Sequence, residues 1–280
     1  MPYNDNNKYY LGYCNDKITN KHPTTDGWIQ VMNTLKLPLQ EYDKSRILLG
    51  ILNEHKEIVV KVGGNDSIRS EYEYARRLYR IKGFVKFICY FECNDDFTNY
   101  PQSSKTSICN GPGTKMKTII MPYFPLGCVG FYNWTDIQQF RSCLKQAFLS
   151  HKNALDSGLL HGDFHAGNVL LKTTKQSQIL YEIDDNEFVI ETNGLRTWIM
   201  DFENTREIAR DEPKDMIDYY YDIQKFIFGL QDHRFIQKID RASVVPLLRI
   251  ISQQNQMVYP DIQFTKKILH SIDNIVFRAA

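Results

Sequence analysis

Residues 161–168 read HGDFHAGN, and residues 199–203 read IMDFE. The first stretch places one acidic residue, Asp163, five positions before a carboxamide, Asn168, and the second adds another acid, Asp201. A carboxylate can orient a hydroxyl and accept its proton, and an amide with a second carboxylate can hold magnesium against nucleotide phosphates. The two stretches together therefore predict phosphoryl transfer, with Asp163 as the catalytic base.

Upstream, a strand and a helix each carry a charged residue where an apolar one is expected. EIVVKV at 57–62 is a β-branched run that predicts a strand with a single lysine, Lys61. SEYEYARRLYRI at 70–81 predicts a helix in which Glu71 lies on the apolar face. Because a buried glutamate is costly unless it is paired, we expect Glu71 to bind Lys61. Glu73 is the alternative partner, although it shares its face with an arginine. An exposed edge lysine is the other interpretation of Lys61.

Three further segments complete the pattern. KTIIMPYFPLG at 117–127 is an apolar strand that runs into a bend containing proline and glycine. Residues 135–157 have the apolar periodicity of a long helix, with Thr135 opening a capping box. This helix leads directly into HGDFHAGN. In YYYDIQKFIFGL at 219–230, Asp222 stands near the start of an apolar helix.

The order of these features resembles that of the protein-kinase-like superfamily. The residues that carry the resemblance are Lys61, Glu71, the segment 121–124, His161, Asp163, Asn168, Asp201 and Asp222. The resemblance implies an α+β, two-lobed fold, with an antiparallel β-sheet small lobe at residues 1–124 and a mainly helical large lobe at 125–280. It makes 121–124 the hinge, and it makes Asp222 a buried brace for the backbone of the catalytic loop.

The resemblance also implies a reaction that uses ATP and Mg²⁺. Lys61, held by Glu71, is expected to grip the α and β phosphates. Asp163 is expected to be the base, and Asn168 and Asp201 are expected to bind the metal.

The resemblance also implies roles for the hinge and for the two histidines of HGDFHAGN. The carbonyl of Pro122 is expected to accept a hydrogen bond from the adenine edge and the N–H of Phe124 to donate one, with Met121 at the back of the nucleotide pocket. An ordinary buried strand is the alternative for this segment. His161 is expected to brace the loop. His165 either steadies the transferred phosphate as a catalytic residue or only packs.

Two branches of the superfamily compete, because His165 stands where most Ser/Thr kinases carry a lysine. The stretch resembles the aminoglycoside and choline phosphotransferases, and the choline type also tends to read IDFE where this chain reads IMDFE. It equally resembles the haspin-like protein kinases, which carry a β-structured excursion before the magnesium aspartate. QILYEIDDNEFVIET at 178–192 alternates apolar and polar positions around an Asx-rich turn, which predicts a β-hairpin insert at about 172–195. This insert favours the haspin-like branch.

The preferred hypothesis is a haspin-like Ser/Thr protein kinase that phosphorylates a protein hydroxyl. A small-molecule kinase of the choline or aminoglycoside type is the first alternative. The second alternative is a catalytically weak pseudokinase that acts as a binding module. Two observations support this second alternative. No GxGxxG precedes Lys61, and Glu203 stands where protein kinases carry the glycine of DFG. Gly50 is the one glycine of residues 35–52, and it is expected within a strand.

Global properties set further limits. With 280 residues and 42% apolar composition, the chain can bury a sizeable core. A net charge of +1 argues against a dedicated nucleic-acid or membrane surface. Six cysteines without zinc-site spacing are expected to be free thiols in a reducing compartment. The polar insert at 95–115 is expected to be either disordered or functional.

The expected location and partners follow from the same properties. Without a run of 18 apolar residues or a signal peptide, the chain is expected to be a soluble protein of the cytoplasm or nucleus. We expect a monomer whose partners are ATP and a protein substrate. The abundance of Asn, Lys, Ile and Tyr suggests the AT-rich genome of a large DNA virus, which places the protein in an infected host cell.

Overall fold

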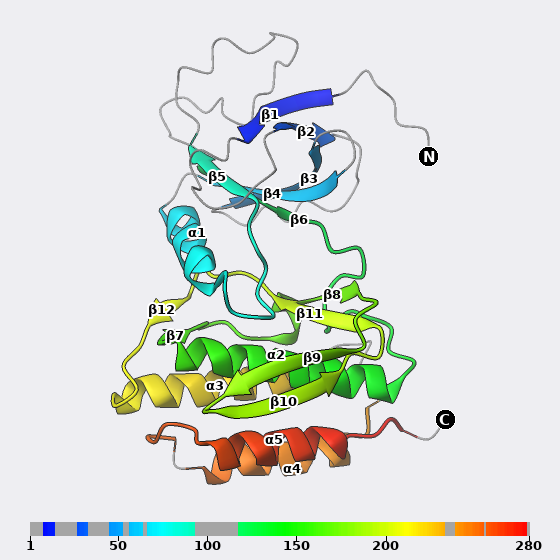
Figure 1. Cartoon of the computed structure of the whole chain (residues 1–280), viewed down its shortest axis with the longest axis vertical. Coiled ribbons are helices and arrows are strands. Elements are labelled where there is room, and N and C mark those ends of the chain that lie inside the picture. The colour runs from blue at the N-terminus through cyan, green and yellow to red at the C-terminus, as the bar shows by residue number, and fades with distance from the viewer. Residues whose placement is uncertain are drawn as a thin grey trace. The chain divides into compact units, whose positions relative to one another are not determined.

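The structure is a computed structural model of the chain, shown in Figure 1. It describes residues 8–14, 27–32, 45–52, 56–63, 66–92, 117–232, 239–254 and 256–278. The chain divides into two compact units. Unit 1 comprises residues 1–76 and 86–123, and unit 2 comprises residues 77–85 and 124–280. The polar insert expected at 95–115 lies outside the described residues.

Unit 1 contains an antiparallel sheet. Its described strands, six in all, follow the order β1-β2-β3-β4-β6-β5. They are β1 (Lys8–Cys14), β2 (Gly27–Met32), β3 (Ser45–Leu52), β4 (Lys56–Gly63), β5 (Cys89–Glu92) and β6 (Lys117–Pro122). Strand β4 lies between β3 and β6, and its β-branched Ile58 and Val60 are fully buried. Gly50 lies within β3, as predicted.

Helix α1 (Ser67–Leu78) begins and ends three residues before the predicted helix at 70–81. Beyond the helix the chain turns, and the N–H of Ile81 bonds to the carbonyl of Leu78 at 2.9 Å. Residues 77–85 belong to unit 2, whereas the predicted division kept them in the small lobe. Backbone hydrogen bonds explain the difference, because Val85 donates to Ile199 at 2.8 Å and Ile199 donates to Gly83 at 2.7 Å.

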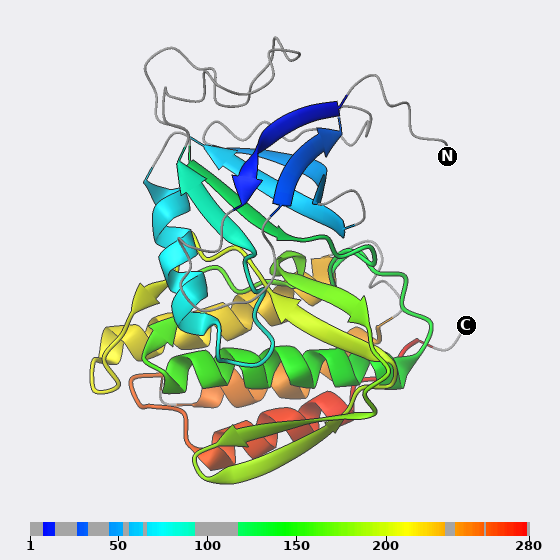
Figure 2. The ribbon, with the colours of Figure 1, turned by 45° about the horizontal axis from the view of Figure 1, so that its top comes forward.

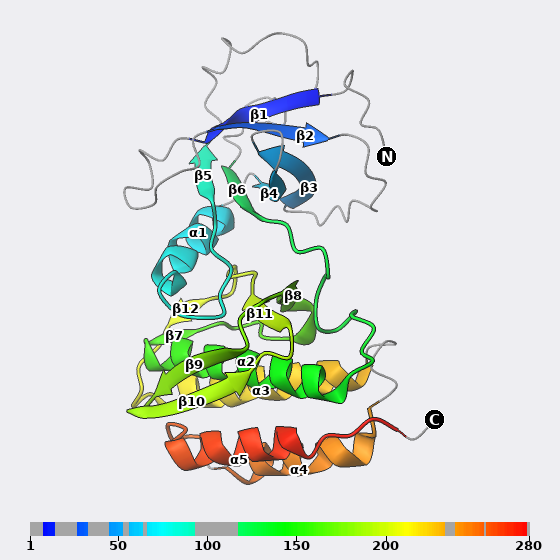
Figure 3. The same cartoon turned by 45° about the vertical axis from the view of Figure 1, so that its right-hand side comes forward.

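Unit 2 is mainly helical. Its helices are α2 (Ile137–Asp156), α3 (Pro213–Asp232), α4 (Arg241–Gln253) and α5 (Ile262–Asp273). Its antiparallel strand pairs are β7 (Leu159–Leu160) with β12 (Arg206–Glu207), β8 (Val169–Thr173) with β11 (Leu195–Ile199), and β9 (Gln178–Ile183) with β10 (Asn186–Glu191). Figure 3 shows α2 and α3 between the β8–β11 pair and the α4–α5 pair. Together with the sheet of unit 1, this arrangement confirms the predicted α+β class.

Two further helix starts, those of α2 and α3, also differ from the prediction. The N-cap of α2 is Asp136 and not Thr135: its carboxylate accepts hydrogen bonds from the N–H groups of Gln138 at 2.7 Å and Gln139 at 3.3 Å. Helix α3 begins at Pro213, six residues before the predicted start. The first turns of α3 carry polar residues that mask the apolar periodicity, and proline at the first helical position is compatible with helix geometry.

The insert forms the predicted hairpin, which packs on α2 (Figure 1). Figure 2 shows its two strands side by side at the lower edge of unit 2. Asp184 and Asp185 make its turn with φ values of 47° and 59°, the left-handed conformation that a tight hairpin of this hand requires. The inner face is buried through Tyr181 and Ile183. The turn is tied to α2 by Lys152, whose fully buried ammonium lies 3.6 Å from the carboxylate of Asp184.

Among the described residues, no helix combines the length and the apolar character needed to cross a membrane.

Candidate active site

The loop predicted to be catalytic, called the catalytic loop below, runs from β7 to a short 3₁₀ turn, η4 (Ala166–Asn168), and then into β8. Gly162 has φ of 77°, and a Cβ on it would lie 2.4 Å from the carbonyl oxygen of Asn204. Glycine is therefore required here both for its conformation and for the close approach of the backbone. This requirement explains the second letter of HGDFHAGN.

Asp222 braces this loop from α3. Its carboxylate accepts hydrogen bonds from the N–H groups of Gly162 at 2.8 Å and Phe164 at 3.4 Å, and it lies 3.4 Å from Nε2 of His151. Burial tends to raise the pKa of Asp222, but the contacts with His151 and the loop hold that pKa below its usual range. The buried brace predicted for Asp222 is present.

His161 fixes the other side of the loop. Its Nε2 lies 2.9 Å from the carbonyl oxygen of Met200, and its Nδ1 accepts a hydrogen bond from the N–H of Asp163 at 3.2 Å. Burial lowers the pKa of His161, which agrees with a neutral ring that donates through Nε2 and accepts through Nδ1. His161 contacts backbone on both sides, as expected of a brace.

Asp163 is surrounded by donors. Nε2 of His165 lies 3.5 Å from its Oδ2, the ammonium of Lys225 contacts its Oδ1, and Nδ2 of Asn168 lies 3.0 Å from its backbone oxygen and 3.3 Å from Oδ2. The hydrogen bond from His165, joined by that from Lys225, outweighs burial and holds the pKa of Asp163 well below its usual range. The carboxylate is therefore ionised at neutral pH, as a general base must be.

Lys225 was not predicted. It lies in α3, three residues after Asp222, within the apolar run IQKFIFGL. A lysine in an apolar run is the same signal that singled out Lys61. Applied to α3, it would have marked Lys225 as a residue that needs a partner.

Asn168 and Asp201 are brought to the same end of the β8–β11 pair. The register pairs Val169 with Ile199, and the N–H of Met200 bonds to the carbonyl of Asn168 at 2.9 Å. Asp201 has φ of 67°, a left-handed conformation that an aspartate adopts at moderate cost and that is often found at functional sites.

The side chains of Asn168 and Asp201 carry oxygens of the kind that magnesium prefers, so the two residues are chemically suited to the ion expected there. The amide nitrogen of Asn168 is committed to Asp163, which turns its oxygen away from that residue. Amide and carboxylate oxygens are the ligands that this hard cation prefers. In the part of the chain that the structure describes, no cluster of three or more His, Cys, Asp or Glu side chains could hold a metal. Magnesium needs no such cluster, because it commonly takes one or two protein ligands and completes its shell with phosphates and water.

Unit 1 contributes the predicted ion pair. Nζ of Lys61 lies 2.7 Å from Oε2 of Glu71, and the two residues are 8% and 1% exposed. The alternative partner, Glu73, has a 54% exposed side chain and lies 3.6 Å from Arg76. A buried pair of this kind is weak evidence for stability but fixes the position of its lysine.

The segment expected to bind adenine ends β6. Met121 pairs with Val59 and Pro122 with Ile58 in the β4–β6 ladder, and Met121 is buried. Phe124, which belongs to unit 2, is also buried, with its ring centroid 6.2 Å from that of Trp198. The nucleotide contacts of Met121, Pro122 and Phe124 stay predictions.

The segment after Asp201 is held in place without a long loop. Arg206 contacts Asp215 and lies 2.6 Å from Asp218, both on α3. The N–H of Ala209 bonds to Asp215 at 2.9 Å. Glu203, which replaces the glycine of DFG, is exposed.

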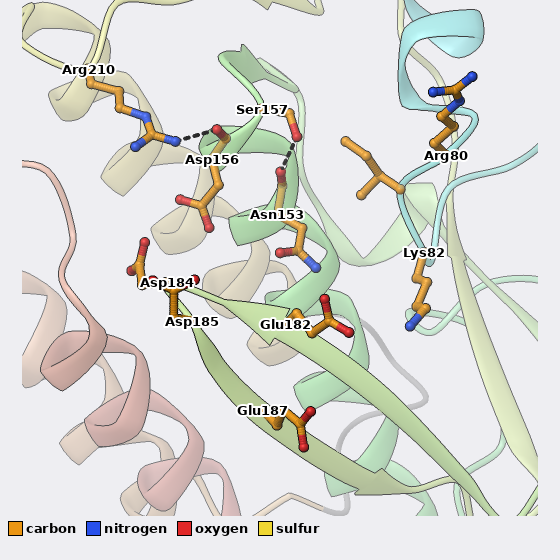
Figure 4. Close-up of a pocket in the computed structure, with 11 residues that line it drawn as sticks. Arg80, Lys82, Asn153, Asp156, Ser157, Glu182, Asp184, Asp185, Glu187 and Arg210 are labelled. Carbon is orange, nitrogen blue, oxygen red and sulfur yellow. Dashed lines mark hydrogen bonds between the residues drawn. The ribbon is translucent and has the colours of Figure 1, made fainter.

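A separate pocket of about 650 Å³ lies in unit 2, among α2, the β9–β10 hairpin and the residues that follow α1 (Figure 4). Charged side chains line it, including those of Lys82, Glu182, Asp185 and Arg210. None of the predicted site residues lines this pocket. It is therefore distinct from the catalytic loop.

The order of elements agrees with the sequence prediction. A lysine strand, a glutamate helix, a strand ending at Pro122, a long helix, the catalytic loop and the helix that carries Asp222 follow one another as in the predicted protein-kinase-like fold. The fold prediction is confirmed.

Comparisons with known proteins give partial likenesses. No protein-family model matches the chain. "Putative phosphotransferase 057R" of Frog virus 3 (isolate Goorha) is 34% identical over 71 residues, which are 25% of this chain and 14% of that protein. The chain thus matches about a seventh of that relative's length.

Among solved structures, the BubR1 kinase domain is 10% identical with a TM-score of 0.44, over 67% of this chain and 50% of that one. WaaP in complex with acyl carrier protein is 15% identical with a TM-score of 0.46, over 83% of this chain and 87% of that one.

Proposed function

We propose that this chain is a phosphotransferase that uses ATP and Mg²⁺. The observation that carries the proposal is the environment of Asp163, whose ionised carboxylate is held by His165 and Lys225. The loop that bears it is fixed by Asp222. The local likeness to a viral protein named as a phosphotransferase supports the same chemistry.

The residues divide the work as follows. Asp163 orients the acceptor hydroxyl and takes its proton as the oxygen attacks phosphorus. Asn168 and Asp201 hold magnesium, which neutralises charge on the nucleotide phosphates when it is bound. Lys61, fixed by Glu71, grips the α and β phosphates.

The adenine and the transferred phosphate are assigned to the remaining site residues. Pro122 accepts from the adenine edge, Phe124 donates to it, and Met121 lies behind the base. His165 donates through Nε2, since its Nδ1 already accepts from the N–H of Gly167 at 3.0 Å. Its Nε2 lies 3.5 Å from Oδ2 of Asp163, and this long contact can be exchanged for one with a phosphate oxygen.

The proposed acceptor is a protein hydroxyl, in the manner of the haspin-like branch. The supporting feature is the β9–β10 hairpin, whose outer face exposes Glu182, Glu187 and Val189. Because the inner face of the hairpin is packed on α2, its outer face is the surface that an extended peptide can bind. The IMDFE sequence favours the second candidate, a kinase of small hydroxylated molecules.

Transfer from labelled ATP tests the proposal. The protein is incubated with Mg²⁺ and a panel of proteins and small alcohols, alongside Asp201→Asn, and ATP binding is followed by thermal shift. We expect magnesium to increase the ATP-dependent shift, the shift to vanish in Asp201→Asn, and label to enter a protein. Label in a small alcohol alone would favour the second candidate, and a metal-independent shift without transfer would favour a pseudokinase.

A further inference from the structure

Two charged side chains of helix α3 contact the catalytic loop. Asp222 binds the backbone of the loop, and Lys225, three residues later on the same face of the helix, binds the carboxylate of Asp163. Lys225 approaches from 62 residues away in the sequence. Its side chain is 39% exposed, so burial alone does not force the contact.

The loop itself supplies no permanent positive charge. HGDFHAGN contains neither lysine nor arginine, and His165 is the one basic side chain that follows the aspartate in it. Nδ1 of His165 accepts from the N–H of Gly167, so its ring can act on Asp163 as a neutral donor through Nε2. A full charge beside Asp163 therefore has to come from another element.

The two oxygens of Asp163 are used differently. Lys225 contacts Oδ1, whereas Oδ2 has longer contacts, with Asn168 at 3.3 Å and His165 at 3.5 Å. Long contacts are readily shared with or replaced by a hydroxyl donor. This difference leaves Oδ2 as the atom that meets the acceptor.

We propose that Lys225 is the positioning residue of the catalytic base: from α3 it holds Oδ1 of Asp163, so that Oδ2 is presented to the substrate hydroxyl. The proposal rests on the proposed role of Asp163. It assigns to α3 the charge that the loop lacks. A purely structural ion pair is the competing explanation, and a partly exposed pair of that kind contributes little to stability.

Three variants test the assignment kinetically. Lys225→Met removes the charge at similar length, Lys225→Arg restores a charge, and Lys214→Met removes an exposed lysine from the same helix as a matched control. We expect Lys225→Met to lower kcat by about tenfold to a hundredfold, the scale of a misplaced reacting group, with KM for ATP unchanged. Lys225→Arg should recover most of the loss, and Lys214→Met should behave as wild type.

A raised KM for ATP with unchanged kcat would overturn the assignment, as would equal effects of the two methionine variants. A direct readout separates this proposal from the proposed function. The orientation of the Asp163 carboxylate is compared in crystal structures of wild type and Lys225→Met. Even if wild type transfers no phosphate, an unchanged orientation in Lys225→Met overturns the role of Lys225, and a rotated or displaced carboxylate supports it. If Lys225→Met does not fold, the same comparison with Lys225→Gln decides.

Discussion

At the scale of single residues, a charged residue within an apolar stretch of sequence indicates a side chain that is buried and needs a partner. Lys61, Glu71 and Asp222 each stand in an apolar context in the sequence, and each is buried beside a partner. Lys152 is equally buried but ties the hairpin to α2. Buried charge thus locates constrained residues, and their chemical surroundings are needed to separate catalytic roles from structural ones.

The Lys61–Glu71 pair is predicted to serve function more than stability. Lys61→Met leaves the buried Glu71 without its lysine and should lower the free energy of unfolding by about 3 kcal/mol or more. In the double variant Lys61→Met/Glu71→Leu, apolar packing should restore most of that stability, because buried pairs are commonly replaceable by apolar groups. Denaturant unfolding measures both effects.

Activity separates the two roles of this pair. ATP-dependent transfer should be lost in the single and the double variant alike. Normal transfer in the double variant would show that Lys61 is not part of the active site. A double variant as unstable as the single one would show that the pair itself stabilises unit 1.

At the scale of elements, the catalytic loop is shaped by one close backbone contact. Gly162 and Gly194 have similar left-handed φ values of 77° and 83°, but only Gly162 has backbone atoms where a Cβ would lie. Substituting each by alanine therefore separates conformational cost from steric clash.

Gly194→Ala should cost about 1 kcal/mol of stability, the scale of a left-handed alanine, and should keep activity. Gly162→Ala should cost more, and it should abolish transfer because Asp163 is the next residue. Unfolding curves and transfer rates measured on both variants check this. Similar losses in the two variants would mean that the loop tolerates the added methyl group.

The hairpin prediction concerns its outer face. Excising residues 180–189 would remove buried Tyr181 and Ile183, so exposed positions give the cleaner test. Glu187→Ser with Val189→Ser should leave stability nearly unchanged and should lower protein phosphorylation more than hydrolysis of ATP by water. Comparing the two rates in the variant and in wild type is the measurement. Equal effects on both reactions would exclude the hairpin from substrate binding.

At the scale of the whole molecule, local pattern predicted the order of elements and the loop that bears Asp163. It did so because strand composition, helical periodicity and a motif of fixed spacing are local properties. Local pattern does not predict contacts between segments that are distant in the sequence. Residues 77–85 join unit 2 through Ile199, and Lys225 contacts Asp163 from α3. The start of α3 was missed because Asp215 and Asp218, which pair with Arg206, hide its apolar face.

The central claim is that Asp163 is the base of a phosphoryl transfer. The most direct measurement compares wild type with Asp163→Asn, a substitution of nearly equal size, for ATP-dependent transfer and for binding of magnesium and ATP. The account predicts that binding and folding stay nearly intact while transfer falls by about 10² or more, the scale of a lost acid or base group. Equal turnover in the two proteins would contradict it.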